Sequence, residues 1–146
     1  AAGYAVVAFF SVNELAALAL GGGEAFTWML GVVTGGAGSG NLLTGIVAPF
    51  HGKVLSEFAI CVVAPTDVDL AGTINTEIGG TNVTGSAIAI AAGNTVGLKI
   101  AGAAITAENR FHEGDLVDVE YTAGTAGTAG DGLYAIYWVG VKELGL

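Results

Sequence analysis

The stretch LVDVEYTAGTAGTAGDGLYAIYWVGV, residues 116–141, decides the fold. In its first part Val117, Val119 and Tyr121 share one parity, and acids occupy the other. A period of two is typical of a β-strand with one buried and one wet face. The last part, Leu133 to Val141, is apolar on both parities. Such a strand is central and covered on both sides, or lies at a subunit interface.

The triplet Thr-Ala-Gly, repeated three times over residues 122–130, separates these two strands. Three triplets are too few for a repeat fold. With Asp131 and Gly132 they form a link of about ten residues, longer than the two to five residues of a tight hairpin. We interpret the link as a surface loop and expect folding to survive its replacement by Asn-Gly.

Short strand patterns separated by glycine turns continue upstream, over residues 54–64, 73–78, 86–91 and 95–105. In the first, Val54, Phe58 and Ile60 fall on one parity, and Glu57 falls on the other. Strands at intervals of about 8–12 residues indicate an antiparallel β-sandwich or barrel. The sequence therefore predicts an all-β protein.

A boundary near Pro49 divides the chain into two regions. Residues 1–49 are an apolar, glycine-rich N-terminal region, and residues 50–146 form the β-sandwich module. Residues 1–52 contain no Lys or Arg, and their only acids are Glu14 and Glu24. The first region is either an arm or edge that packs on neighbouring copies, or the first strands of the same sandwich.

The composition favours association with other subunits and excludes two classes of partner. Hydrophobic residues make up 53% of the chain and charged residues 12%, against roughly 25% charged in an average domain. Apolar surface that charges cannot cover is commonly buried against a partner. The formal charge of −9 argues against binding to nucleic acid or to an anionic membrane surface. The apolar N-terminus has polar interruptions and no basic flank, so we expect no membrane span or signal peptide.

Large aromatic side chains are the candidates for the subunit interface, because amphipathic rings are enriched in interface cores. The candidates are Phe9, Phe10, Trp28, Tyr134, Tyr137 and Trp138. For the two tryptophans, which lie in apolar runs, packing in a core or interface is favoured over stacking on a sugar.

Four acids near the end of the chain are the candidate cation ligands: Glu113, Asp115, Asp118 and Glu120. Carboxylate oxygens suit calcium, but their spacing is not that of an EF-hand loop. HEGD, residues 112–115, instead indicates a turn in which Gly114 takes a positive φ and Asp115 bonds the nearby backbone. We expect no metal and no cofactor.

No sequence motif indicates catalysis. His51 and His112 stand alone, without G-x-S-x-G, H-E-x-x-H or paired C-x-x-C around them. The single cysteine, Cys61, lies in an apolar run and is interpreted as a small buried hydrophobe. We therefore expect that the protein is not an enzyme.

From Phe50 onward the chain resembles the small β-sandwich proteins of bacteriophage virions, above all capsid decoration (cement) and head-fibre proteins. The resemblance covers residues 50–143 and rests on glycine turns that lead into alternating strands, on an N-x-F-x-x-G-D corner (residues 109–115) and on the V-x-V strand at residues 117–119. It implies a jelly-roll-like sandwich, a homotrimer, the major capsid protein as partner, and a place on the capsid surface of the virion. The alternative is a carbohydrate-binding or adhesin-type module, from a phage fibre tip or a bacterial surface.

Overall fold

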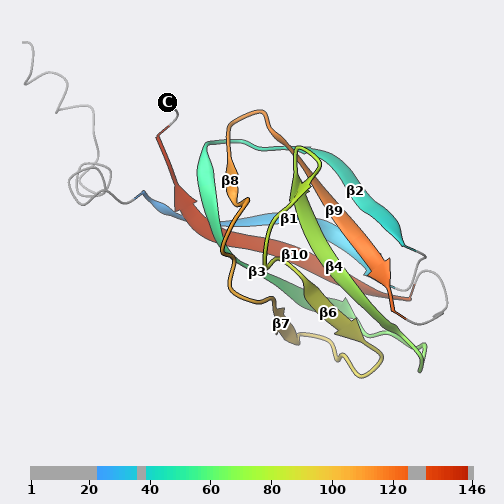
Figure 1. The fold of residues 1–146 in the computed structure, drawn as a ribbon. Helices are drawn as coiled ribbons and strands as arrows, with labels where there is room; N and C mark the ends of the chain where they lie inside the picture. The colour runs from blue at the N-terminus through green and yellow to red at the C-terminus, as the bar shows by residue number, and fades with distance from the viewer. Residues whose placement is uncertain (1–22, 36–38, 125–130, 145–146) are drawn as a thin grey trace, which may run out of the picture.

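A computed structural model describes residues 23–35, 39–124 and 131–144 of the chain. Within these residues the chain is all β, without a helix (Figure 1). The strands are β1 (Ala25–Gly35), β2 (Gly40–Val47), β3 (Gly52–Val63), β4 (Ala71–Ile78), β5 (Thr81–Asn82), β6 (Ile88–Ala91), β7 (Lys99–Ala101), β8 (Arg110–Phe111), β9 (Leu116–Ala123) and β10 (Asp131–Lys142).

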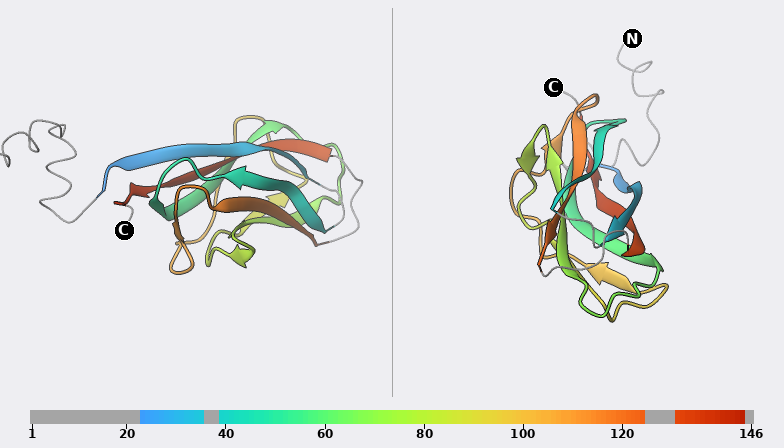
Figure 2. Two further views of the ribbon diagram at one scale, coloured as in Figure 1. Left: turned by 90° about the horizontal axis from the view of Figure 1, so that it is seen from above. Right: turned by 90° about the vertical axis from the view of Figure 1, so that its right-hand side faces the viewer.

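The strands form two antiparallel sheets that pack face to face (Figure 2). Sheet A has the order β1-β10-β3-β7, with β8 also on β3. Sheet B has the order β2-β9-β4-β5, with β6 also on β4. The pairs β1–β10, β2–β9, β3–β7 and β4–β6 nest inside one another, first strand with last, and this nesting is the jelly-roll arrangement of a sandwich. The predicted fold class is confirmed.

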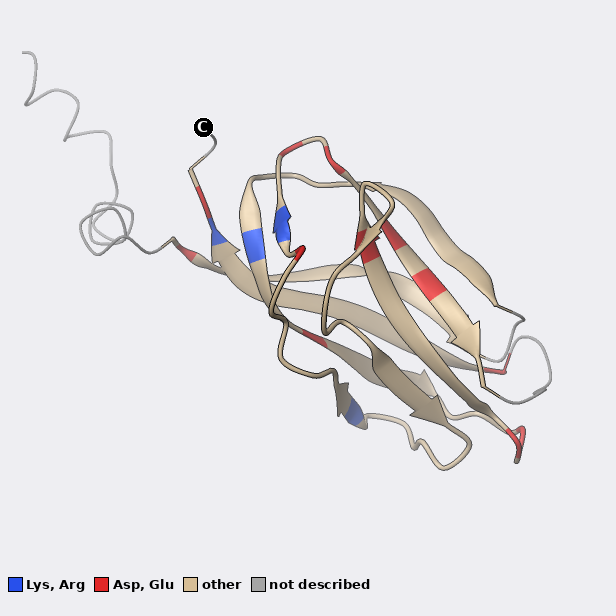
Figure 3. Cartoon of the chain, in the orientation of Figure 1, with Lys and Arg blue, Asp and Glu red and all other residues tan. Residues whose placement is uncertain are grey.

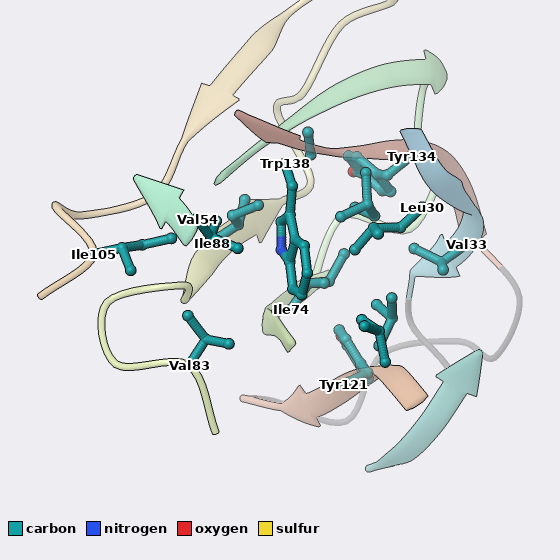
Figure 4. Close-up of a cluster of buried hydrophobic side chains, with 14 of the residues drawn as sticks. Leu30, Val33, Val54, Ile74, Val83, Ile88, Ile105, Tyr121, Tyr134 and Trp138 are labelled. Atoms are coloured by element: carbon teal, nitrogen blue, oxygen red, sulfur yellow. The ribbon is translucent and has the colours of Figure 1, made fainter. Parts of the chain in front are cut away.

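The core lies between the inner faces of the two sheets, and Trp138 of β10 reaches into its middle (Figure 4). Ile74 of β4 and Tyr121 of β9 meet it from sheet B, and both side chains are fully buried. Phe111 packs against the indole with ring centroids 5.6 Å apart. Aromatic side chains bury the most apolar area per residue, so this cluster supplies much of the stabilisation of the sandwich.

Most sequence alternations correspond to the observed faces. In β9, Val117, Val119 and Tyr121 are buried. In β6, Ile88 and Ile90 are buried between exposed alanines. β10 is a central strand of sheet A, as its apolar sequence predicts. Of residues 95–105, where the sequence predicts a strand, only the three residues of β7 are a strand.

The region before residue 49 supplies strands to both sheets. β1 is the edge strand of sheet A, paired with β10, and β2 is the edge strand of sheet B, paired with β9. From residue 25 onward this region therefore belongs to the sandwich. Its earlier part, residues 1–22, lies outside the described residues.

The link after β9 connects one sheet to the other. Residues 125–130 lie outside the described residues, but the two strands that they join are in different sheets. A two-residue turn joins neighbouring strands about 5 Å apart, whereas stacked sheets are about 10 Å apart. Because the link crosses between the sheets, we now expect that Asn-Gly cannot replace it.

Replacing residues 122–130 by Asn-Gly should abolish cooperative thermal unfolding, because β9 and β10 could no longer reach their own sheets. Circular dichroism melts measure this. Deletion of one Thr-Ala-Gly triplet is the matched control and should shift the melting temperature little. A normal melt of the Asn-Gly variant would contradict the assigned topology.

Gly140 marks a close approach of β10 to β3. A Cβ atom at this position would lie 2.0 Å from the carbonyl oxygen of Lys53, a backbone atom that cannot move without shifting the strand. Gly140→Ala should therefore lower the free energy of unfolding by about 1–3 kcal/mol or more in urea titration. Gly93, which has open space around its Cα, is the control: Gly93→Ala should change stability little. Equal effects of the two substitutions would contradict the assigned packing.

Candidate functional site

The four predicted cation ligands do not form one site. Asp118 and Glu120 lie on the outer face of β9, on which Asp118 Oδ1 accepts a hydrogen bond from Gly45 N at 2.7 Å. Glu113 and Asp115 belong to the turn before that strand. Among residues 23–35, 39–124 and 131–144, no group of three His, Cys, Asp or Glu side chains is placed to hold a metal ion.

The turn at residues 112–115 is built as its sequence predicts. Gly114 has a φ of 92°, and Asp115 Oδ2 accepts a hydrogen bond from the backbone N–H of His112 at 2.7 Å. The turn also brings the two histidines together, with ring centroids 5.5 Å apart. His51 Nδ1 accepts a hydrogen bond from Glu113 N at 3.2 Å. These contacts join two loops at one end of the sandwich, a pairing that the sequence did not suggest.

The aromatic residues predicted for the interface separate into three groups. Tyr134 and Trp138 are completely buried between the sheets of one chain, so neither can contact another subunit while the sandwich is intact. Trp28 is half-buried and lies edge-on to Trp138, with ring centroids 5.6 Å apart. Of the four candidates that the structure describes, Tyr137 alone points to the outer face of sheet A, where its ring stacks on Phe58. The other two candidates, Phe9 and Phe10, lie outside the described residues.

A carboxyl group that sequence reasoning missed lies inside the core. Glu57 of β3 is 1% exposed, and its Oε2 accepts hydrogen bonds from Trp138 Nε1 and Thr76 Oγ1, both at 2.7 Å. Thr76 is on β4, so the three side chains connect sheet A to sheet B. Ser86 Oγ extends this polar cluster by accepting a hydrogen bond from Thr76 N.

The local backbone explains why Glu57 faces inward. The register between β3 and β10 shifts between the pairs Val139–Ser56 and Gly140–Val54, which is a β-bulge. A bulge moves the residues after it to the opposite face. Val54 and Glu57 therefore both point to the core, although their parities differ. An acid in the middle of an apolar strand was the only sequence signal for this site.

Burial raises the pKa of Glu57 from 4.5 to about 8, and the hydrogen bonds from Thr76 and Trp138 lower it only in part. Its Oε1 has no hydrogen-bond partner. A neutral carboxylic acid is the form that such surroundings favour. The group therefore acts as a neutral link within the core at mildly acidic pH, and ionisation opposes folding.

The pKa of Glu57 predicts how stability depends on pH. The folded-state pKa is raised, so its contribution is complete below about 4.5 and is lost as the pH rises toward 8. Across that window this group should make the unfolding equilibrium constant rise by up to about tenfold per pH unit. Glu57→Gln should remove this slope in urea titrations at pH 5, 6, 7 and 8. The control Glu113→Gln, in an exposed turn, should keep it; a slope that persists in Glu57→Gln would contradict the assignment.

The outer face of sheet B is acidic. Glu77 of β4 is the cross-strand partner of Asp118, and Glu120 pairs with the neighbouring Asn75. Figure 3 shows these acids on adjacent stretches of β4 and β9. Partial burial and the charges of Glu120 and Asp118 raise the pKa of Glu77. Carboxylates held this close repel one another, and a solvated face tolerates them best.

The outer face of sheet A is apolar. We call it the apolar face and define it by the apolar residues that strand register places there: Met29, Val32, Phe58, Ile60, Val63, Leu133, Ala135, Tyr137 and Val139. The register also places Thr27, Thr34 and Ser56 on this side of the sheet. Met29 is 50% exposed, Val32 46% and Val63 47%. Within the described residues, the charge nearest its centre is Lys99 of β7, whose Nζ lies 4.4 Å from the centroid of the Phe58 ring. The two sides of the sandwich therefore differ sharply in polarity.

A shallow, open hollow of about 290 Å³ lies beside sheet B. Its lining is Ile78, Thr81, Glu108, Asn109 and Arg110. Arg110 is engaged in an ion pair with Glu143, at 3.2 Å. The lining includes the hydroxyl of Thr81 and the carboxylate of Glu108 but no histidine, cysteine or lysine, and we assign the hollow no chemistry.

No family model, no curated protein and no solved structure matches this chain. Over the parts of the chain that the structure describes, no helix has the length and apolar character needed to cross a membrane.

Proposed function

We propose that this chain is a structural protein of a virion, a capsid decoration protein that binds to copies of itself and to the major capsid protein on the capsid surface. The observation that carries the proposal is the contrast between the apolar face of sheet A and the acidic face of sheet B. A protein with such faces is suited to burying one side against a partner and presenting the other to water.

Energetic reasoning supports assembly as the source of function. Each Å² of apolar surface removed from water stabilises a complex by about 25 cal/mol. A protein that binds only the assembled shell stabilises it by mass action, and several copies in a ring strengthen each contact through avidity. This mechanism needs surface complementarity and no catalytic group.

The jelly-roll fold is compatible with the proposal but does not decide it, because virion proteins and carbohydrate-binding proteins both use this fold. For the carbohydrate-binding or adhesin alternative, the tryptophans would be expected to offer a flat ring to a sugar. Trp138 is fully buried and Trp28 packs against it. The described residues thus favour the structural function over this alternative.

The proposal predicts a homotrimer of the 14.4 kDa chain in native mass spectrometry at low micromolar concentration. Val32→Lys, which places a charge on the apolar face, should weaken association at least about tenfold, because a buried ammonium group costs more than the apolar contact that it replaces. With shells of the virus that encodes the chain, the parent protein should raise the temperature at which they dissociate.

Thr122→Lys is the matched control, since Thr122 is exposed at the end of β9, beside the acidic face. It should leave both the trimer and the effect on shells unchanged. A parent chain that stays monomeric at these concentrations, or a Val32→Lys variant that assembles normally, would contradict the proposal.

A further inference from the structure

We infer that the apolar face of sheet A is covered by the N-terminal segment of this chain, residues 1–22. The inference deepens the proposed function, on which it rests in one respect: the apolar face is taken to be a contact surface. It names the part of the protein that fills this surface, and its test separates that question from assembly.

The apolar face needs a cover. Met29 and Val32 of β1 and Val63 of β3 are each close to half exposed. Between these two strands lies β10, which contributes Leu133 and Val139 to the same face. The stacked rings of Phe58 and Tyr137 stand in the middle of this area, with centroids 4.9 Å apart. A contiguous apolar surface on three strands is the kind that folded proteins place against another segment or subunit.

The composition of residues 1–22 fits this surface. The segment reads AAGYAVVAFFSVNELAALALGG and carries one charged side chain, Glu14. Phe9, Phe10 and Leu15 are among the large apolar groups that it would otherwise leave in water. The charge beside the centre of the apolar face is the ammonium group of Lys99. One carboxylate and one ammonium group are therefore complementary across the contact.

The point of attachment also fits. The segment leads into β1, the edge strand of sheet A, through Gly21, Gly22 and Gly23. Glu24 O accepts a hydrogen bond from Lys142 N at 2.7 Å, which holds the start of β1 against the end of β10. The eleven residues of β1 span about 36 Å. A segment of 22 residues extends up to about 73 Å, which is enough to run the length of the sheet and return.

Photocross-linking in the full chain tests the inference without removing any segment. A benzophenone side chain is introduced at position 137, or in a second variant at position 29, both on the apolar face. After irradiation, the cross-linked peptides are mapped by mass spectrometry. Equal amounts of ¹⁴N- and ¹⁵N-labelled protein are mixed beforehand, so that the isotopes identify which copy supplies each peptide. A benzophenone at position 122, beside the acidic face, is the matched control.

Cross-links from positions 137 and 29 should map to residues 1–22, and those from position 122 should not. Phe9→Asp combined with Phe10→Asp should lower the yield about tenfold while the circular dichroism melt of the sandwich is unchanged. Cross-links that map to residues 25–144 of another copy would overturn the inference and keep self-association. The absence of cross-links from both positions would overturn it as well.

The isotopes separate this inference from the proposed function. Mixed-isotope cross-links to residues 1–22 support both, because the segment then passes between copies. Single-isotope cross-links support the inference and count against self-association through this face, because the segment then covers its own sheet.

Discussion

The indole N–H of Trp138 has to find an acceptor in the middle of the sandwich, and Glu57 supplies it at 2.7 Å. An unpaired donor at this depth would cost the core a large part of its stability. The same carboxyl oxygen accepts a hydrogen bond from Thr76 of the opposite sheet. The contact therefore sets the alignment of β3 with β10 within sheet A and the seating of β4 beneath them. The bulge in β3 turns the side chain of Glu57 toward the core, where it makes this contact.

The hydrogen bonds of Glu57 lie in the core, whereas the outer faces of the two sheets differ in polarity. The Glu57 carboxyl group is enclosed between the two sheets and is 1% exposed. Outside, the acids gather on β4 and β9, while apolar side chains gather on β1, β10 and β3. In a chain with only 12% charged residues, three acids, Glu77, Asp118 and Glu120, lie together on the outer face of sheet B. The other face is then available for contact with protein.

The sequence predicted well those strands whose buried face alternates without interruption. β9 and β6 obey the period of two, and β10 is central because it is apolar on both parities. The prediction failed where backbone geometry intervenes: the bulge in β3 reverses the parity rule, and Glu57 enters the core. Tyr134 and Trp138, which were candidates for an interface, lie in the core, because an apolar run does not reveal which of its two faces meets the opposite sheet. The nesting of strand pairs joins segments far apart in the chain, which local sequence patterns do not reveal. For the same reason the sequence did not show that residues 125–130 join one sheet to the other.

The proposed assembly requires the apolar face of sheet A to be covered in solution. Met29, the only methionine of the chain, lies on that face and is 50% exposed in the isolated sandwich. Its oxidation to the sulfoxide by hydrogen peroxide can therefore be followed by intact mass, with the urea-unfolded chain as the reference for free access. If the face is covered, the native protein should be oxidised at least about tenfold more slowly than the unfolded chain. The reason is that a contact with an equilibrium constant of about ten leaves the Met29 sulfur accessible only about a tenth of the time. Oxidation of native and unfolded protein at the same rate would contradict the claim.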